Sequence, residues 1–300
     1  MRVARFDNGR IGLLSDEGLI DISDIAGSGD GQWPDTAVQR LIRDFEHLRP
    51  QLEQAVATRE AVAPDNVRLE TPVPWPNKII AYPVNYHAHG KEMGAGYRAK
   101  NQGFFLKPPS SLSGPSDPIE LPVVPGREVH REAELGIIIG KQCRDVARED
   151  WREAVFGYAC LLDMVVRGRE ERVFRKAYDT FCPVGPWIVT ADEIEHPDQL
   201  SMKLWVNGEL RQAANTRDLV LDIPGMVATA SAVMTLYPGD IIATGTPEGV
   251  GPVEDGDTIR IVIDQVGEMN LRVIQGDRGA TEVFEDAYVP PIVKQELTDR

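Results

Sequence analysis

Hydrophobic and polar positions alternate over the first 25 residues in three short stretches, RVARFDNG, RIGLLSDEG and LIDIS. Asn8-Gly9 and Glu17-Gly18 separate these stretches, and such pairs are typical of tight turns between strands. Hydrophobic residues then recur at helical spacing over residues 35–57. The pattern therefore predicts a small β-meander that is followed by one amphipathic helix.

A proline-rich stretch, TPVPWPNK at 71–78, separates this first part from a longer, β-rich part. We therefore expect two units, a small N-terminal α/β module at 1–70 and a larger domain at 71–300. The expected buried strands are KIIAYPV, ELGIIIGK, LWVNGEL and TIRIVID, and the segments expected to be helical at least in part are REDWREAVFGYACLLD and DIPGMVATASAVMTL. Glycine and proline clusters between short strands favour an α+β, sheet-dominated roll or sandwich over a parallel doubly wound sheet.

The composition narrows the class of protein. The net charge is −15, from 47 acidic and 32 basic residues, which disfavours nucleic acid or an anionic membrane surface as a partner. A pocket for an acidic substrate must therefore create its own positive field, which a bound divalent cation would supply. The chain has no apolar run of 18 residues, its first residues lack a signal-peptide pattern, and its three cysteines are scattered. We expect a cytoplasmic protein without a membrane span.

Two acids, Glu132 and Glu134, stand one residue apart at the head of an apolar run. In a strand both carboxylates point to the same face, where like charges repel. One interpretation is a strand start with solvated acids, and the other is a divalent cation between them, which needs a third oxygen ligand. Asp163 is a candidate because a carboxylate within an apolar stretch is costly unless it is paired or metal-bound. An ion pair with Arg167, four residues on, explains Asp163 equally well.

A second group of candidate residues lies in VNYHAHGKEM at 84–93. His89 and Glu92 are three residues apart, so on one helical turn the carboxylate would hold the imidazole in one tautomer, as in a general base that deprotonates water. The alternative for His87 and for His89 is an exposed loop histidine. The loop ATGTPEGVG at 243–251 either offers backbone N–H groups to an oxyanion or carboxylate, or is a plain turn.

Seven stretches of the chain resemble, in this order, the fumarylacetoacetate hydrolase superfamily: NYHAHGKE, FFLKPPSSLSGPSDPIELP, EAELGIIIGK, GYACLLDMVVR, KAYDTFCPVGPW, VNGELRQAANT and LYPGDIIATGTPEGVG. The resemblance runs from about residue 78 to about residue 275, and the N-terminal module resembles the small leading domain of longer members. It implies the mixed β-sandwich roll of that superfamily and a homodimer. The superfamily includes acylpyruvate hydrolases, decarboxylases, hydratases and isomerases, so the resemblance specifies the fold more closely than the reaction.

The resemblance also implies roles for individual residues. Glu132, Glu134 and Asp163 match the three metal carboxylates of the superfamily, and three hard oxygen ligands suit Mg²⁺ or Mn²⁺ better than zinc. The other matched residues are His89 and Glu92 (a dyad on a lid segment at 90–104), Lys176 (near the substrate oxygens), and Arg167, Gly245 and Thr246 (substrate binding).

One position departs from the pattern. Where the superfamily commonly reads Arg-Asp-x-Gln, this chain reads Arg167-Gly168-Arg169-Glu170. An acid at position 170 repels a substrate carboxylate unless the acid is protonated or turned away. The exact substrate and the role of Glu170 therefore depend on where this side chain points.

The preferred hypothesis is metal-dependent hydrolysis of a C–C bond in a 2,4-dioxo acid of the acylpyruvate or fumarylpyruvate kind, through a metal-bound pyruvate enolate. His89, oriented by Glu92, would deprotonate water, and Lys176 would stabilise the oxyanion. The alternative is an isomerase or decarboxylase of an unsaturated or β-keto oxo-diacid at the same site, with Arg167 and Arg169 holding a second carboxylate. A third hypothesis is a non-catalytic oxo-acid binding protein.

Overall fold

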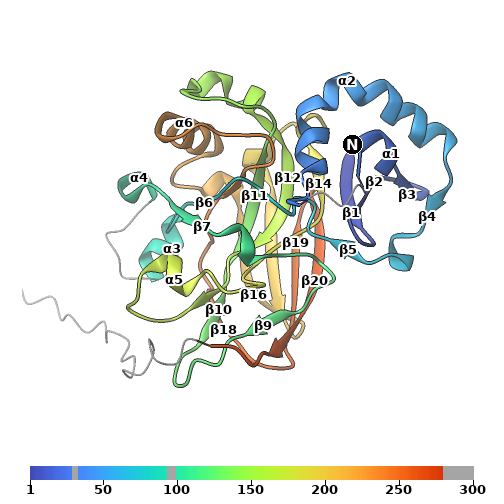
Figure 1. Cartoon of the computed structure of the whole chain (residues 1–300). Coiled ribbons are helices and arrows are strands. Elements are labelled where there is room, and N and C mark those ends of the chain that lie inside the picture. Colours follow the sequence, from blue (N-terminus) through green and yellow to red (C-terminus); the bar gives the residue numbers. More distant parts are fainter. Residues whose placement is uncertain (29–32, 93–98, 280–300) are drawn as a thin grey trace, which may run out of the picture.

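The structure is a computed structural model, and it describes residues 1–28, 33–92 and 99–279. Its first elements are β1 (Arg2–Phe6), β2 (Arg10–Ser15), β3 (Gly18–Asp21), α1 (Ser23–Ala26), α2 (Ala37–Thr58), β4 (Ala61–Val62) and β5 (Leu69–Glu70). The antiparallel meander β1–β3 and the long helix α2 lie where the hydrophobic pattern predicts them (Figure 1).

The remaining elements follow from residue 79 on. They are β6 (Ile79–Ala81), α3 (His87–Glu92), α4 (Ala99–Gln102), β7 (Phe105–Lys107), β8 (Leu112–Ser113), β9 (Ile119–Leu121), β10 (Val129–Arg131), β11 (Ala133–Ile139), β12 (Val155–Leu162), β13 (Val165–Val166), α5 (Arg172–Arg175), β14 (Cys182–Thr190), β15 (Ser201–Val206), β16 (Glu209–Asn215), α6 (Ile223–Val233), β17 (Ile241–Ala243), β18 (Gly251–Val253), β19 (Thr258–Ile263) and β20 (Gly267–Gln275).

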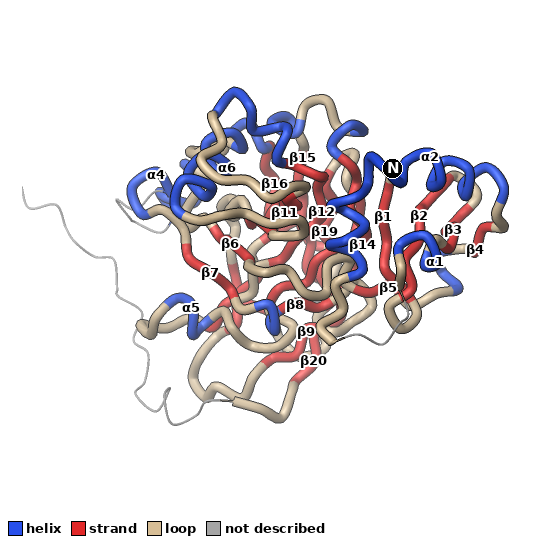
Figure 2. The backbone as a smooth tube through the Cα atoms, turned by 45° about the horizontal axis from the view of Figure 1, so that its top comes forward, coloured by secondary structure: helices blue, strands red, loops and turns tan. Residues whose placement is uncertain are grey.

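One large sheet runs through the molecule in the order β4-β3-β2-β1-β14-β12-β11-β17-β6-β7. Because β1 pairs antiparallel with β14, the N-terminal meander extends the central sheet (Figure 2). A second sheet, β16-β15-β19-β20-β9, and a small one, β13-β10-β18, complete the β structure. The predicted sheet-dominated mixed fold is confirmed, whereas the division into units 1–70 and 71–300 stays a prediction.

The centre of the large sheet is buried on both faces. Every residue of β11 and β12 is buried, because one hydrophobic cluster contains Leu135 and Ile137 and another contains Ile138. The segment 148–163, which was expected to be helical at least in part, forms a 3-10 helix over Arg148–Ala154 and strand β12 over Val155–Leu162. A short apolar run that is buried on both faces carries no period by which a strand can be told from a helix.

The two longest helices pack on the outside of the sheets. In α2 the buried positions include Val38, Leu41 and Phe45, which form the predicted apolar stripe. In α6 the predicted helix is confirmed, and Asp222 caps it by accepting the Gly225 N–H at 3.1 Å. None of the helices in the described ranges is both long and apolar enough to cross a membrane.

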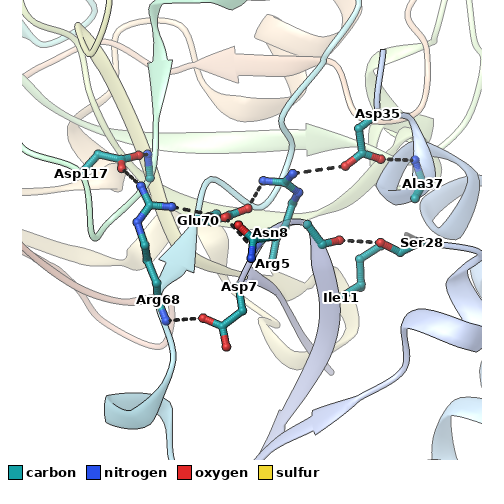
Figure 3. Close-up of polar contacts among 12 residues, drawn as sticks. Arg5, Asp7, Asn8, Ile11, Ser28, Asp35, Ala37, Arg68, Glu70 and Asp117 are labelled. Carbon is teal, nitrogen blue, oxygen red and sulfur yellow. Dashed lines mark hydrogen bonds and ion pairs between the residues drawn. The ribbon is translucent and has the colours of Figure 1, made fainter. Parts of the chain in front are cut away.

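A network of charged residues ties the N-terminal strands to the rest of the chain (Figure 3). Arg5 on β1 pairs with Glu70 on β5 and, through Nη2 at 3.2 Å, with Asp35 ahead of α2. Arg68 pairs with Asp117, which lies in the loop before β9. These bridges hold β5 against β1 and the residue before β5 against the loop that precedes β9.

Candidate active site

Three carboxylates meet where β11 and β12 run side by side. Glu132 precedes β11, Glu134 is its second residue, and Asp163 directly follows β12. The antiparallel register places Glu134 opposite Leu161, and the Asp163 N–H donates to the Glu132 carbonyl at 2.9 Å. One oxygen from each of the three side chains lies within 4.8 Å of the other two. Strand register thus brings Asp163 to two acids that lie about 30 residues earlier in the sequence.

These acids are neither solvated nor paired as the simpler alternatives predicted. Glu132, Glu134 and Asp163 expose 8, 2 and 1 % of their surface, so the alternative of a strand start with solvated acids is wrong. The ion pairs of Asp163 run to Lys107, 2.7 Å from Oδ1, and to Lys176, 2.5 Å from Oδ2, so the alternative of a pair with Arg167 is wrong too. Lys176 also donates to Glu132 Oε2 at 2.7 Å.

The buried groups of the cluster differ in how far their surroundings favour the charged form. Burial opposes the charged form of Glu132, but the positive charges of Lys176 and Arg167 outweigh it and lower the pKa of Glu132 to about 2. Burial and the neighbouring charge of Asp163 raise the pKa of Glu134 well above its ordinary value. Burial also opposes the charged form of Lys176, yet attraction to Asp163 and Glu132 raises the pKa of its ammonium. Glu134 is therefore the carboxylate whose charged form the surrounding residues stabilise least.

The donor set fits a hard divalent cation. Carboxylate oxygens are the ligands that Mg²⁺ and Mn²⁺ prefer, and three of them leave room in an octahedron for water or substrate oxygens. Glu134 makes no ion pair with any described lysine or arginine, and its Oε2 accepts only the Gly245 N–H, at 2.7 Å. A dication beside Glu134 would supply the positive charge that this carboxylate lacks.

Helix α3 carries a histidine that shares a cavity with the carboxylates and a glutamate that contacts this histidine. His89 is buried, whereas His87 two residues earlier is exposed. His89 Nδ1 lies 2.9 Å from Glu92 Oε2, and because an ionised carboxylate only accepts, Nδ1 carries the proton and Nε2 is left as an acceptor. The predicted dyad is therefore assembled. Part of the lid expected at 90–104, residues 93–98, lies outside the described residues.

Glu92 is itself tied to the loop that precedes β18. Its Oε1 accepts the Gly249 N–H at 3.1 Å. The carbonyls of Gly249 and Gly251 accept in turn from Arg131, at 3.0 Å from Nη2 and 2.6 Å from Nη1. Gly249 has a φ of +86°, a conformation that side chains other than glycine rarely adopt. A continuous set of contacts thus runs from Arg131 on β10 through this loop to the dyad.

The three carboxylates and His89 line one cavity of about 100 Å³, and Glu92 stands behind His89 outside the lining. The other residues that line it are Tyr82, Pro83, Val84, Phe105, Val165, Arg167, Arg172, Arg175, Lys176 and Thr246. Of the three predicted substrate-binding residues, Arg167 and Thr246 line the cavity, while the N–H of Gly245 is engaged by Glu134. Thr246 Oγ1 accepts from Gln212 at 2.9 Å, so its hydroxyl proton is available to a ligand.

Sequence reasoning did not find three positively charged side chains of the site, and it left the role of one acid, Glu170, undecided. Lys107, Arg172 and Arg175 were not singled out, although a lone lysine closing the apolar stretch FFLK was a weak signal for Lys107. Glu170, the departure from the superfamily pattern, is turned away from the cavity: it does not line the wall, and its Oε1 accepts from Arg127 at 3.1 Å. The Glu170 carboxylate is therefore paired with Arg127 outside the cavity lining.

The fold and the cavity define a strand-rich, mixed α/β protein that presents a buried three-carboxylate site beside a His–Glu dyad. The family model described as fumarylacetoacetate (FAA) hydrolase C-terminal matches residues 78–274. The chain belongs to this family, and the resemblance of the seven stretches is confirmed.

Several relatives match almost the whole chain. A maleylpyruvate hydrolase of Aquipseudomonas alcaligenes is 40% identical over 285 residues, which cover 91% of this chain and 99% of the relative. The crystal structure of maleylpyruvate hydrolase from Sphingobium sp. SYK-6, in complex with manganese(II) ion and pyruvate, has 68% identity and a TM-score of 0.86 and covers 92% of this chain and 100% of that one. A 5-carboxymethyl-2-hydroxymuconate delta-isomerase from Mycobacterium smegmatis has 32% identity and a TM-score of 0.72, with coverage of 92% and 100%.

Proposed function

We propose that the protein is a metal-dependent hydrolase that cleaves the C–C bond of a 2,4-dioxo acid, an acylpyruvate such as maleylpyruvate or fumarylpyruvate, to pyruvate and a carboxylic acid. The observation that carries the proposal is that three buried carboxylates and His89, which Glu92 contacts at 2.9 Å, line one cavity. The relatives named maleylpyruvate hydrolase, at 40% and 68% identity, support the substrate class.

Glu132, Glu134 and Asp163 are the proposed holders of one divalent cation, Mg²⁺ or Mn²⁺. When bound, such a cation supplies a Lewis acid that polarises the 2-oxo acid end of the substrate and balances the charge that develops there. The manganese ion in the solved Sphingobium relative supports this assignment.

His89 has the geometry of a general base. Its Nε2 accepts a proton from water, and the water oxygen forms a bond to the C4 carbonyl carbon of the substrate. Breaking the C3–C4 bond then leaves a carboxylic acid and the pyruvate carbanion, which regains a proton at C3. Glu92 holds the imidazole in the required tautomer and stabilises the imidazolium that forms.

Lys176 and Arg167 are the proposed contacts for the substrate oxygens. The Lys176 ammonium donates to Glu132 and Asp163, which uses two of its three N–H bonds and leaves one for the developing oxyanion. The Nε of Arg167 donates to His130 Nδ1 at 2.9 Å, which fixes the guanidinium and leaves its terminal nitrogens for a carboxylate. Thr246 adds a hydroxyl, and Gly245 holds Glu134 in place.

The test is a turnover assay with purified protein on acetylpyruvate, fumarylpyruvate and maleylpyruvate, with Mg²⁺ or Mn²⁺ and with EDTA, followed by NMR of the products. We expect pyruvate and the matching acid in equal amounts with metal, and no conversion with EDTA. Release of carbon dioxide would indicate a decarboxylase. A product of unchanged mass would indicate an isomerase, such as the Mycobacterium smegmatis relative. Either result without pyruvate contradicts the proposal, as does recovery of every substrate.

We further propose that the protein is a cytoplasmic homodimer. The cytoplasm is supported by the state of Cys143, Cys160 and Cys182, which are all free thiols. The dimer rests on the resemblance to the superfamily, and sedimentation equilibrium of the purified protein tests it.

A further inference from the structure

The cavity carries more positive groups than the 2-oxo acid end of a substrate requires. Its lining cations are Arg167, Arg172, Arg175 and Lys176, against the acids Glu132, Glu134 and Asp163. A bound dication would add to this excess. The whole chain, in contrast, has a net charge of −15, so the positive charge is concentrated at the site. A substrate with a single carboxylate would neutralise only part of this positive charge.

The arginines differ in how far their guanidinium groups are already engaged. Arg175 donates to two backbone carbonyls, that of Glu170 at 2.8 Å and that of Val166 at 3.2 Å, so it braces the segment before α5. The Nε of Arg167 is held by His130. Arg172 makes no hydrogen bond or ion pair with any residue that the structure describes, although it is half-buried in the cavity wall.

Arg172 is nevertheless held in place. Its guanidinium carbon lies 5.3 Å from the centre of the Phe105 ring, an arrangement in which a cation is attracted to the ring face. Phe105 belongs to β7, beside which α5 packs (Figure 1). The Lys176 ammonium lies 5.7 Å from the same ring. Both cations therefore border one aromatic surface, with Lys176 on the side of the carboxylate cluster.

From this geometry we propose that Arg172 binds the distal carboxylate of a dicarboxylic substrate, so that the enzyme selects dioxo acids whose acyl end carries a second acid group. The inference rests on the proposed function and names the substrate class of the same site. A guanidinium offers a planar pair of donors that matches a carboxylate. The unsaturated chain of such a substrate lies along Phe105 while its 2-oxo acid end faces the three carboxylates.

Arg169 is the matched control. It lies close to Arg172 in the chain and carries the same charge, but it is exposed and does not line the cavity. The sequence-based alternative assigned a second carboxylate to Arg167 and Arg169. The cavity wall instead makes Arg172 the residue in position for that role.

The experiment compares fumarylpyruvate with acetylpyruvate, which lacks the distal carboxylate, on the metal-loaded wild type and on Arg172→Met, Arg172→Lys and Arg169→Met. We expect Arg172→Met to lower kcat/KM for fumarylpyruvate about 10- to 100-fold, because one charge-assisted contact is lost. For acetylpyruvate the change should stay within about twofold. Arg172→Lys, which keeps the charge without the planar fork, should be intermediate, and Arg169→Met should resemble the wild type.

A binding titration makes the test independent of turnover. The ligands are 2-oxoheptanedioate and 2-oxoheptanoate, which have the same chain length and no 4-oxo group to cleave. The wild type should bind the diacid about 10- to 100-fold more tightly, and Arg172→Met should bind both equally. Equal losses on both substrates, or an unchanged preference for the diacid in Arg172→Met, overturn the role of Arg172. If the wild type cleaves neither acylpyruvate, the proposed function fails, and the titration still decides the role of Arg172.

Discussion

Replacing Lys107 by methionine tests how far the order of the site depends on one buried ammonium. The Lys107 side chain is fully buried, and its Nζ donates to Asp163 Oδ1 at 2.7 Å, to the Lys176 carbonyl at 2.8 Å and to the Phe181 carbonyl at 3.3 Å. Methionine has a similar length and volume but no donor. Lys107→Met therefore removes three hydrogen bonds, one of which is also an ion pair, while it changes the packing little.

The expected cost follows from these contacts. Removing one partner of a buried ion pair costs about 3–5 kcal/mol, because the other charge stays buried. Asp163 still accepts a hydrogen bond from Lys176 on its Oδ2. We therefore take the lower end of this range, about 3 kcal/mol, as the cost of losing the ion pair. Two carbonyls that lose a donor add a further ~1 kcal/mol. We therefore expect the free energy of unfolding to fall by about 4 kcal/mol, a large part of the ~5–15 kcal/mol that is typical of folded proteins.

Urea unfolding in EDTA, followed by circular dichroism, measures this loss without a contribution from bound metal. Lys141→Met is the control, because Lys141 pairs with Glu153 at 2.9 Å with side chains that are 52% and 69% exposed. Its loss should cost less than about 1 kcal/mol. If Lys107→Met also unfolds within about 1 kcal/mol of the wild type, the reasoning about the buried pair is refuted.

Three further predictions concern the dyad, its support and the thiols. Glu92→Gln should lower kcat about 100-fold with unchanged Mn²⁺ affinity, since His89 loses its charged partner; loss of metal binding instead would contradict this. Arg131→Met should loosen the 249–251 loop and lower kcat about tenfold, again with unchanged Mn²⁺ affinity, and an unaltered kcat speaks against the coupling. Burial raises the pKa of Cys160 and Cys182 to about 12, so at pH 8 both stay protonated. Ellman's reagent should modify at most Cys143 in the native protein and all three thiols in guanidinium, and rapid native modification of all three would refute this.

Sequence reasoning reached the carboxylate pair because strand geometry alone puts Glu132 and Glu134 on one face. Apart from the family resemblance, Asp163 could be proposed only from the cost of burying a carboxylate, and its simplest partner, Arg167, was wrong. The actual partners depend on the register of β11 against β12 and on the path of β7. These contacts join residues that are far apart in the chain, and the local pattern of hydrophobic and polar residues does not predict them.

The residues that were missed share a physical reason. Lys107 and Arg172 have long, flexible side chains, so their direction is decided by what packs around them. Lys107 ends in the interior only because Asp163 and two carbonyls accept its protons there. The strand Val155–Leu162 was not told apart from the partly helical segment that contains it, because burial on both faces removes the alternation that marks a strand.

The most direct test of the account is a calorimetric titration of metal-free protein with Mn²⁺, on the wild type and on Glu134→Gln. Glu134 is the carboxylate without a lysine partner, so its charge is available to the cation. We expect one Mn²⁺ per wild-type chain and a loss of affinity of at least about 100-fold in Glu134→Gln. A wild type that binds no Mn²⁺, or a variant that binds it as tightly as the wild type, would contradict the claim that these three carboxylates share one metal ion.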